Sequence, residues 1–261
     1  MPPWLPPSTQ LVSAGSTSCT PQTATISEVS RTRLRPLASG ELSVIQALCC
    51  LAFLLSASFT ILLQLNWLSV FLGASSMLLV VSYPLAKRVT YWPQLVLGCT
   101  FNWGALLGYT AVTNSLTWPL LPLYGAGILW TIFYDTIYAH QDKTDDLTIG
   151  VKSTALLFGQ RTGAMLACLG SGMLGCLATV GLATQLAWPF YAGLAGTALH
   201  LSWQVATLKI DDSADCWKKF VSNQYIGLLI FLSILLGNYC KPKPKGITQK
   251  EPETSESSQI E

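Results

Sequence analysis

Long apolar segments dominate this chain and restrict it to folds that bond their own backbone inside a lipid bilayer. A helix needs roughly 20 apolar residues to cross a membrane. About seven stretches approach that length: 42–63, 67–86, 94–113, 117–134, 162–183, 187–208 and 221–239. Only 11% of the residues are charged, whereas soluble domains carry about 25%. Because lipid offers no hydrogen bonds to the backbone, we expect an all-α, polytopic membrane protein with about seven transmembrane helices.

The distribution of charge predicts an orientation and three regions. Lysines and arginines fall in alternate loops, and the opposite short loops around 64–66, 114–116 and 184–186 have none. The positive-inside rule places the charged loops on the cytoplasmic or matrix-like side. Residues 1–28 are rich in Pro, Ser and Thr, with no evident targeting signal, and we expect them to be disordered. The membrane domain then covers 29–240, followed by a polar, disordered tail at 241–261.

The eight cysteines show no CxxC spacing, and most lie in predicted helices. A thiol in that setting behaves as a small apolar side chain, so we predict neither disulfides nor zinc. The net charge of +2 gives no indication of a nucleic-acid partner.

An acidic cluster interrupts the apolar pattern between Ile132 and Gly159. It contains Asp135, Asp142, Asp145 and Asp146, and charge this close to a membrane boundary usually serves chemistry. If the stretch is helical, Asp135, Asp142 and Asp146 share a narrow stripe and Asp145 points away. Stacked carboxylates need a cation between them, and oxygen ligands without a nearby Cys or His pair favour Mg²⁺, which typically bridges to a phosphate.

Cations near the predicted helix ends offer partners for such a phosphate. Lys87 and Arg88 lie at the end of one predicted helix, on the same side as the aspartates, where they would neutralise a diphosphate leaving group. The alternative is an anchor that only sets topology, with Tyr91 and Trp92 as an aromatic belt. Lys152 allows two interpretations as well: a further phosphate cation, or part of a helix start that Ser153 caps.

Three polar residues in or near the predicted helices also allow structural interpretations. Asn102 sits beside small residues, where helix–helix hydrogen bonding is commoner than a role in lining a pocket. His140 lies inside the acidic cluster and could tune it. His200 is interpreted as a packed core histidine, because the two histidines lack metal-ligand spacing.

Five segments together resemble the UbiA-type membrane prenyltransferases, in the branch that acts on 4-hydroxybenzoate in ubiquinone synthesis. They are RTRLRPLASGELS (31–43), YPLAKRVTYWPQLVLG (83–98), FNWGALLGY (101–109), YDTIYAHQDKTDDLTIGVKSTALLFG (134–159) and DCWKKFVSNQYIGLLIFLSILLGN (215–238). The resemblance implies helices around a central cavity that opens sideways to lipid. It also implies two aspartate-rich motifs that hold Mg²⁺ against a polyprenyl diphosphate. Loss of diphosphate gives an allylic cation, which the ring of 4-hydroxybenzoate attacks ortho to its hydroxyl.

Carried over by position, Asp142 and Asp146 match the second metal-binding motif of the family, with Asp135 and Asp145 as supporting groups. Lys87, Arg88 and Lys152 become diphosphate contacts. The aromatic acid has three candidate pocket residues: Arg35, Asn102 and Tyr138. The family also implies the inner mitochondrial membrane, with the charged loops facing the matrix. Other proteins of ubiquinone synthesis are possible partners.

One departure from the family pattern concerns the first acidic motif, N-D-x-x-D-x-x-x-D. At its expected place the chain reads T-P-Q-T-A-T-I-S-E-V-S, in which Glu28 is the only acid. The two helices that precede this motif in the family, which has nine, are also missing. We therefore expect an incomplete domain over 29–240 and very low or absent activity. Residues 1–28 are expected to be unrelated to the family, as an alternative transcript or a faulty gene model would produce.

Two other functions compete with prenyl transfer. The first is an inactive membrane protein that keeps the fold for assembly or regulation. The second is a seven-helix transporter or receptor, which is disfavoured because transporters usually place charge at mid-membrane and these charges gather at one interface.

Overall fold

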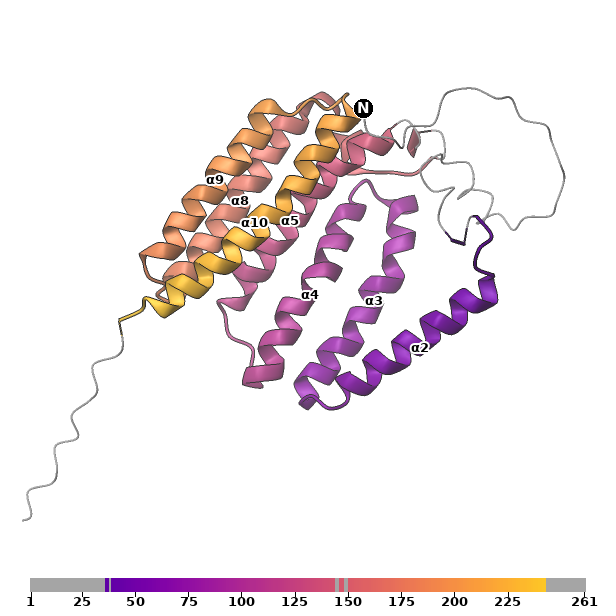
Figure 1. Ribbon diagram of the computed structural model, residues 1–261, viewed down its shortest axis with the longest axis horizontal. Coiled ribbons are helices and arrows are strands. Elements are labelled where there is room, and N and C mark those ends of the chain that lie inside the picture. The colour runs from indigo at the N-terminus through magenta and orange to yellow at the C-terminus, as the bar shows by residue number, and fades with distance from the viewer. Residues whose placement is uncertain (1–35, 38, 144–145, 148–149, 243–261) are drawn as a thin grey trace, which may run out of the picture.

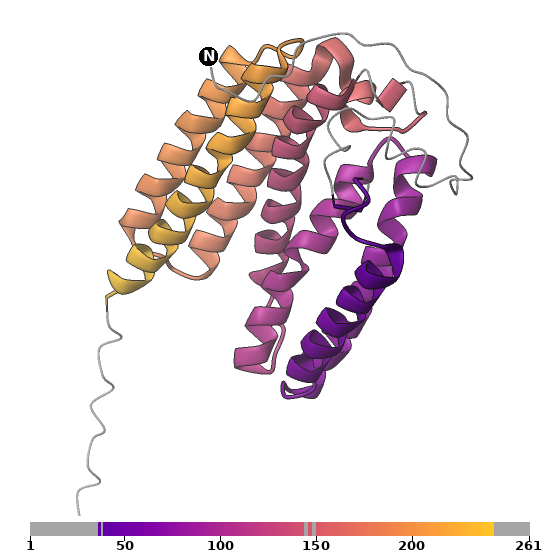
Figure 2. The same cartoon turned by 45° about the vertical axis from the view of Figure 1, so that its right-hand side comes forward.

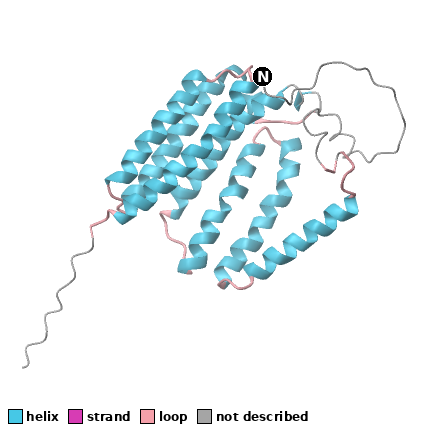
Figure 3. Cartoon of the chain, in the orientation of Figure 1, coloured by secondary structure: helices cyan, strands magenta, loops and turns pink. Residues whose placement is uncertain are grey.

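A computed structural model describes residues 36–37, 39–143, 146–147 and 150–242, and this part of the chain is helical without strands. Figures 1 and 3 show the arrangement of the helices. The long helices are α2 (Val44–Leu62), α3 (Trp67–Val89), α4 (Pro93–Thr113), α5 (Leu120–Ala139), α8 (Thr162–Ala183), α9 (Trp188–Thr207) and α10 (Ser213–Tyr239). Short elements join α5 to α8: the 3-10 turns η1 (His140–Asp142) and η2 (Gly159–Arg161), and the helix α7 (Thr154–Phe158).

Local sequence explains where several helices begin. Ser43 and Gln46 form a reciprocal capping box at the start of α2. The Asn66 side chain accepts a hydrogen bond from Ser69 N at the start of α3. Pro93 lies in the first turn of α4, where its missing N–H has no helical partner to lose. Asn114 ends α4 in the left-handed conformation, with φ of 49°, which Asn tolerates better than most residues.

The long helices pack in two groups that are visible in Figures 1 and 2. In the first group α5, α8, α9 and α10 pack against their neighbours in sequence, and α10 also returns to contact α5. In the second group α4 packs on α5, α3 packs on α4, and α2 contacts α3 only weakly. The polypeptide therefore forms a closed four-helix unit that continues into an arc of three more helices.

The apolar core lies within the four-helix unit. Phe133 and Ile137 of α5, Leu166 of α8, Phe190 of α9 and Ile226 of α10 are all at most 2% exposed. By contrast, α2 has no buried residue, and its large apolar side chains point outward along its whole length. Exposed apolar surface of this kind suits contact with lipid.

The helices confirm the predicted all-α membrane class. Six of them are long and apolar enough to cross a membrane, counted over the described residues. The seventh predicted crossing, 187–208, is present as α9, but this helix does not meet that hydropathy criterion. The largest difference in bounds is at α10, which begins at Ser213 and not near 221, because Asp212 caps it by accepting from Ala214 N and Asp215 N.

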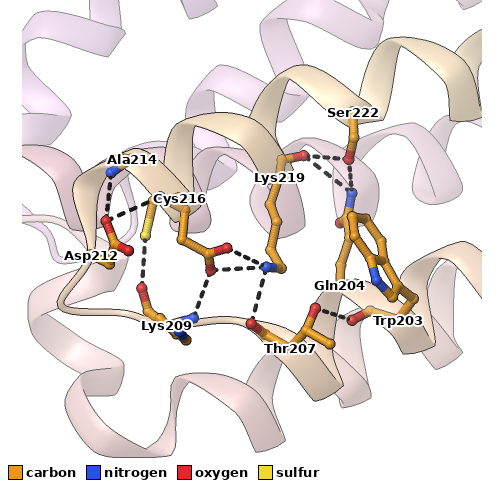
Figure 4. A network of polar contacts seen from close by, with 10 residues as sticks. Trp203, Gln204, Thr207, Lys209, Asp212, Ala214, Cys216, Lys219 and Ser222 are labelled. Atoms are coloured by element: carbon orange, nitrogen blue, oxygen red, sulfur yellow. Dashed lines mark hydrogen bonds and ion pairs between the residues drawn. The ribbon is translucent and has the colours of Figure 1, made fainter. Parts of the chain in front are cut away.

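A buried ion pair holds α9 and α10 together at one end (Figure 4). Lys219 Nζ lies 2.7 and 2.8 Å from the two carboxylate oxygens of Asp215, and it also donates to Thr207 O at 3.0 Å. Asp215 in turn accepts from Lys209 N at 2.9 Å. We call Asp215, Lys219 and Thr207 the hairpin clamp. Lys219 is therefore buried, unlike the exposed lysines of the charged loops.

Candidate functional site

The sequence cluster of aspartates forms one wall of a small polar pocket. The pocket lies among the ends of α3, α4 and α5 and the segment 150–153, with a volume of about 100 Å³. This volume has room for several water-sized groups. It is lined by Tyr83, Pro93, Gln94, Asp135, Tyr138, Ala139, Asp142, Asp146, Val151, Lys152 and Ser153. We call it the aspartate pocket.

The path of the backbone after α5 determines which aspartates meet. Asp135 and Tyr138 lie on α5, which ends at Ala139, and Asp142 lies in the tighter turn η1. The 3-10 turn at His140–Asp142 thus interrupts a regular helix through the cluster, and residues 143, 146 and 147 are α-helical again. Even so, the side chains of Asp135, Asp142 and Asp146 line the same pocket, because the turn continues in the right-handed sense. Asp145 lies outside the described residues.

The segment that closes the pocket is fixed to three helices. Gly150 has φ of +73°, which reverses the chain after the aspartates at little steric cost for glycine. Thr154 Oγ1 lies 2.7 Å from Thr136 Oγ1 of α5, and Thr154 N donates to Gln94 Oε1 of α4 at 3.2 Å. Lys152 Nζ donates to Val89 O, the last residue of α3, at 3.0 Å.

Lys152 is the predicted phosphate cation that the structure places at the pocket. Its Nζ lies 5.2 Å from the centre of the Tyr91 ring in addition to its bond with Val89 O. A cation over an aromatic face is held electrostatically. The ammonium group is therefore held against the α3–α4 connection, while Lys152 as a residue lines the pocket.

The other predicted cations, Lys87, Arg88 and Arg35, are not among the described residues that line the pocket. Arg88 is exposed near the end of α3, and this end is close to the site because Val89 O bonds Lys152. Lys87 belongs to α3, but its side chain lies outside the described part of the chain, as does all of Arg35. The placement thus brings the 87–89 segment next to Lys152 at the aspartate pocket.

Two buried side chains that line the pocket, Gln94 and Ser153, were not identified as site residues from the sequence. Gln94 is 5% exposed, and it bonds to a residue 60 positions later, so no local pattern could have revealed its role. Ser153 occupies the N-cap position of α7, but its side chain makes no capping hydrogen bond. The residue as a whole is 3% exposed, and its hydroxyl has no hydrogen-bond partner among the described residues.

The polar residues inside the helices are placed away from the pocket. Asn102 Nδ2 donates to Gly98 O at 2.8 Å and to Thr131 Oγ1 at 3.0 Å, which joins α4 to α5. His140 is buried with its Nε2 3.0 Å from Thr162 Oγ1 of α8. His200 Nε2 lies 3.1 Å from Ser222 Oγ, between α9 and α10. Each of these three residues thus forms a hydrogen bond that joins two different helical elements.

Aromatic rings border the pocket on the side of α10. Tyr138, which lines the pocket, packs against Phe220 with ring centres 4.7 Å apart and against Trp217 at 6.4 Å. Phe220 also packs against Tyr134 at 5.8 Å. Tyr138 therefore connects the aspartate pocket to a cluster of aromatic rings on α5 and α10.

The carboxylates fit a weakly held divalent ion better than a preformed cage. No group of three or more His, Cys, Asp or Glu side chains in the described ranges is arranged to hold a metal by itself. Mg²⁺ is usually bound through only one or two carboxylates together with substrate phosphates, and it keeps several waters. Oxygen ligands from Asp135, Asp142 and Asp146 around one small pocket match that requirement. The cysteines of the described residues are free thiols.

A larger apolar hollow lies elsewhere in the arc, between α2 and α3. Its volume is about 650 Å³, and Phe59, Leu62 and Met77 are among its lining residues. It shares no lining residue with the aspartate pocket.

Comparison with known families gives one match over most of the chain. The model of the UbiA prenyltransferase family matches residues 27–235. Curated relatives include two proteins named "4-hydroxybenzoate polyprenyltransferase, mitochondrial". The one from Caenorhabditis elegans is 53% identical over 82% of this chain and 60% of its own length. The one from Bos taurus is 52% identical over 85% of this chain and 60% of its own length. The chain thus spans about 60% of the length of these relatives.

A solved structure gives an independent match of the fold. The apo structure of a UbiA homologue from Aeropyrum pernix K1 aligns with a TM-score of 0.68 at 23% identity. The alignment covers 80% of this chain and 78% of that protein. Identity at this level speaks for the arrangement of the helices alone.

Proposed function

The chain belongs to the UbiA prenyltransferase family, and on this premise we propose that it transfers a polyprenyl group from polyprenyl diphosphate to 4-hydroxybenzoate in ubiquinone synthesis. The single observation that carries the proposal is the aspartate pocket, in which three carboxylates and Lys152 meet. The choice of acceptor and of a mitochondrial membrane location follows the name that the two curated relatives share, "4-hydroxybenzoate polyprenyltransferase, mitochondrial". The inner membrane, with charged loops toward the matrix, is part of this proposal.

In the proposed reaction the pocket holds the diphosphate end of the donor. Asp135, Asp142 and Asp146 would bind Mg²⁺, and Lys152 would add positive charge beside the leaving group. When bound, Mg²⁺ supplies neutralisation of the charge that develops on the departing diphosphate. Lys87 and Arg88 are further candidates for this contact because their segment ends beside Lys152.

Bond breaking then leaves an allylic cation that must be kept from water. The C–O bond breaks with both electrons going to the diphosphate, and the ring carbon ortho to the hydroxyl forms the new C–C bond. The ring afterwards loses the proton from that carbon. Tyr138 lines the pocket and packs against Phe220, and aromatic rings there would stabilise positive charge and exclude solvent. Arg35, Asn102 and Tyr138 remain proposals for the acceptor pocket, and among them Tyr138 lines the aspartate pocket.

The test compares charge-removing substitutions at the pocket with one outside it. The 261-residue chain, purified into lipid nanodiscs, is incubated with polyprenyl diphosphate, 4-hydroxybenzoate and Mg²⁺, and the prenylated acid is measured by mass spectrometry. The rate of the chain itself is expected to be very low, and we expect Asp142→Asn and Asp146→Asn each to lower any measured turnover roughly a hundredfold. Asp211→Asn, at an exposed position outside the pocket, is the matched control.

Two outcomes would count against the proposal. Equal rates for Asp142→Asn and Asp211→Asn would show that the pocket takes no part in the reaction. Mg²⁺-dependent binding of the diphosphate without any product would support the alternative of a protein that keeps the fold without turnover.

A further inference from the structure

Ser153 carries a buried hydroxyl that the fold leaves without a partner. The residue is 3% exposed, lines the aspartate pocket, and has no hydrogen-bond partner within the described part of the chain. A hydroxyl removed from water without a replacement hydrogen bond destabilises the protein, so natural structures rarely keep one. An unsatisfied polar group at a proposed site therefore calls for an explanation.

The usual explanation, a helix cap, does not apply. Ser153 has the extended backbone of an N-cap residue, with φ of −147° and ψ of 160°, yet its side chain accepts no bond from α7. The first N–H of α7, that of Thr154, is satisfied instead by Gln94 Oε1 at 3.2 Å. The neighbouring hydroxyl of Thr154 is satisfied by Thr136. Ser153 thus lines the aspartate pocket, and its buried Oγ has no hydrogen-bond partner within the described part of the chain.

The charge around the pocket indicates what the hydroxyl binds. Lys152 also lines the pocket and provides a positive charge, while Asp135, Asp142 and Asp146 provide ligands for a cation. A hydroxyl donates a short, strong hydrogen bond to an anionic oxygen. We infer that Ser153 Oγ donates to a non-bridging oxygen of the diphosphate and is a further binding residue for that group. This inference rests on the proposed function.

The experiment measures binding and stability of the full chain. Inorganic pyrophosphate with Mg²⁺ is the probe, with affinity followed by calorimetry and by phosphorus-31 NMR. We expect Ser153→Ala to weaken pyrophosphate binding about tenfold, which corresponds to about 1.4 kcal/mol. Ser153→Thr keeps the hydroxyl and suits the extended backbone, so its affinity should stay within about threefold of the wild type. Ser171→Ala, at an exposed position of α8, is the matched control.

A second measurement separates a binding role from a structural one. Without ligand, Ser153→Ala removes an unpaired buried hydroxyl, so the unfolding temperature should be unchanged or higher. A lower unfolding temperature would show that the hydroxyl supports the fold, and would overturn the inference. The affinity for 4-hydroxybenzoate alone should not change. If Ser153→Ala weakens that binding and spares pyrophosphate, the acceptor carboxylate is the partner and the inference is wrong.

The failures of the two proposals are distinguishable. Pyrophosphate binding that is equal in Ser153→Ala and the wild type would overturn this inference and leave the proposed function standing. A wild-type chain that binds no pyrophosphate with Mg²⁺ would overturn both.

Discussion

The hairpin clamp between α9 and α10 predicts that one lysine contributes far more to stability than its neighbour in sequence. Lys219 is 3% exposed and bonds to Asp215 and Thr207, whereas Lys218 is exposed. Lys219→Met keeps most of the aliphatic chain and removes the charge. Lys218→Met makes the same chemical change at a position without these contacts, so the pair isolates the clamp.

The expected loss follows from the contacts. Lys219→Met removes two hydrogen bonds to the carboxylate, one to Thr207 O, and a cation–aromatic contact at 5.4 Å from the centre of Trp203. Breaking a fully buried ion pair costs about 3–5 kcal/mol, mostly through the charge left behind. The Asp215 side chain is 21% exposed, so water partly solvates the remaining carboxylate. We therefore expect a loss of about 2–3 kcal/mol.

Thermal unfolding followed by circular dichroism of the helices checks this value. For a chain of this size the loss corresponds to roughly 4–12 °C, while Lys218→Met should change the unfolding temperature by less than about 2 °C. The double variant Asp215→Asn with Lys219→Met should recover part of the loss, because it leaves no unpaired charge. If Lys219→Met matches Lys218→Met, or if the double variant is less stable than Lys219→Met, the reasoning about the clamp is refuted.

Three further predictions concern packing and the pocket. Gly193→Ala should lower the unfolding temperature because the added Cβ would overlap the Ser233 hydroxyl of α10, and Gly193→Ala with Ser233→Gly should restore most of it. Asn102→Ala should cost about 1 kcal/mol in the free energy of unfolding and leave pyrophosphate affinity unchanged; a lower affinity for 4-hydroxybenzoate would place Asn102 in the acceptor pocket. Lys152→Met should weaken Mg²⁺-dependent pyrophosphate binding roughly tenfold while Lys143→Met, outside the pocket, does not, as calorimetry would measure.

The sequence predicted the secondary structure well because hydropathy is a property of local segments. The stretch 162–183 was expected as one helix and is α8, Thr162–Ala183. The predicted apolar stretch began near 221 because four charged residues, Asp212, Asp215, Lys218 and Lys219, precede it. In the structure Asp212 caps the helix and Lys219 is neutralised by Asp215, so the first turns stay helical.

The chemistry of the site was predictable only in part. A cluster of carboxylates near a membrane boundary stands out in any apolar chain, and its residues were identified without the fold. The spacing of the aspartates already placed Asp135, Asp142 and Asp146 on one stripe, and these three line one pocket although a 3-10 turn at His140–Asp142, which the pattern does not reveal, interrupts the helix. The roles of Gln94 and Asn102 depended on partners in other helices, one 60 residues away and one 29.

The sequence by itself therefore determined the membrane-length helices, their connections, and the presence of an acidic site with basic residues near it. Only the tertiary structure decided that Lys152 lies at the pocket with Asp135, Asp142 and Asp146. It also decided that Lys219 is paired and that the Ser153 hydroxyl is not. The physical reason is range: helix formation depends on neighbours within about four residues, whereas pairing of polar side chains depends on which helices pack together.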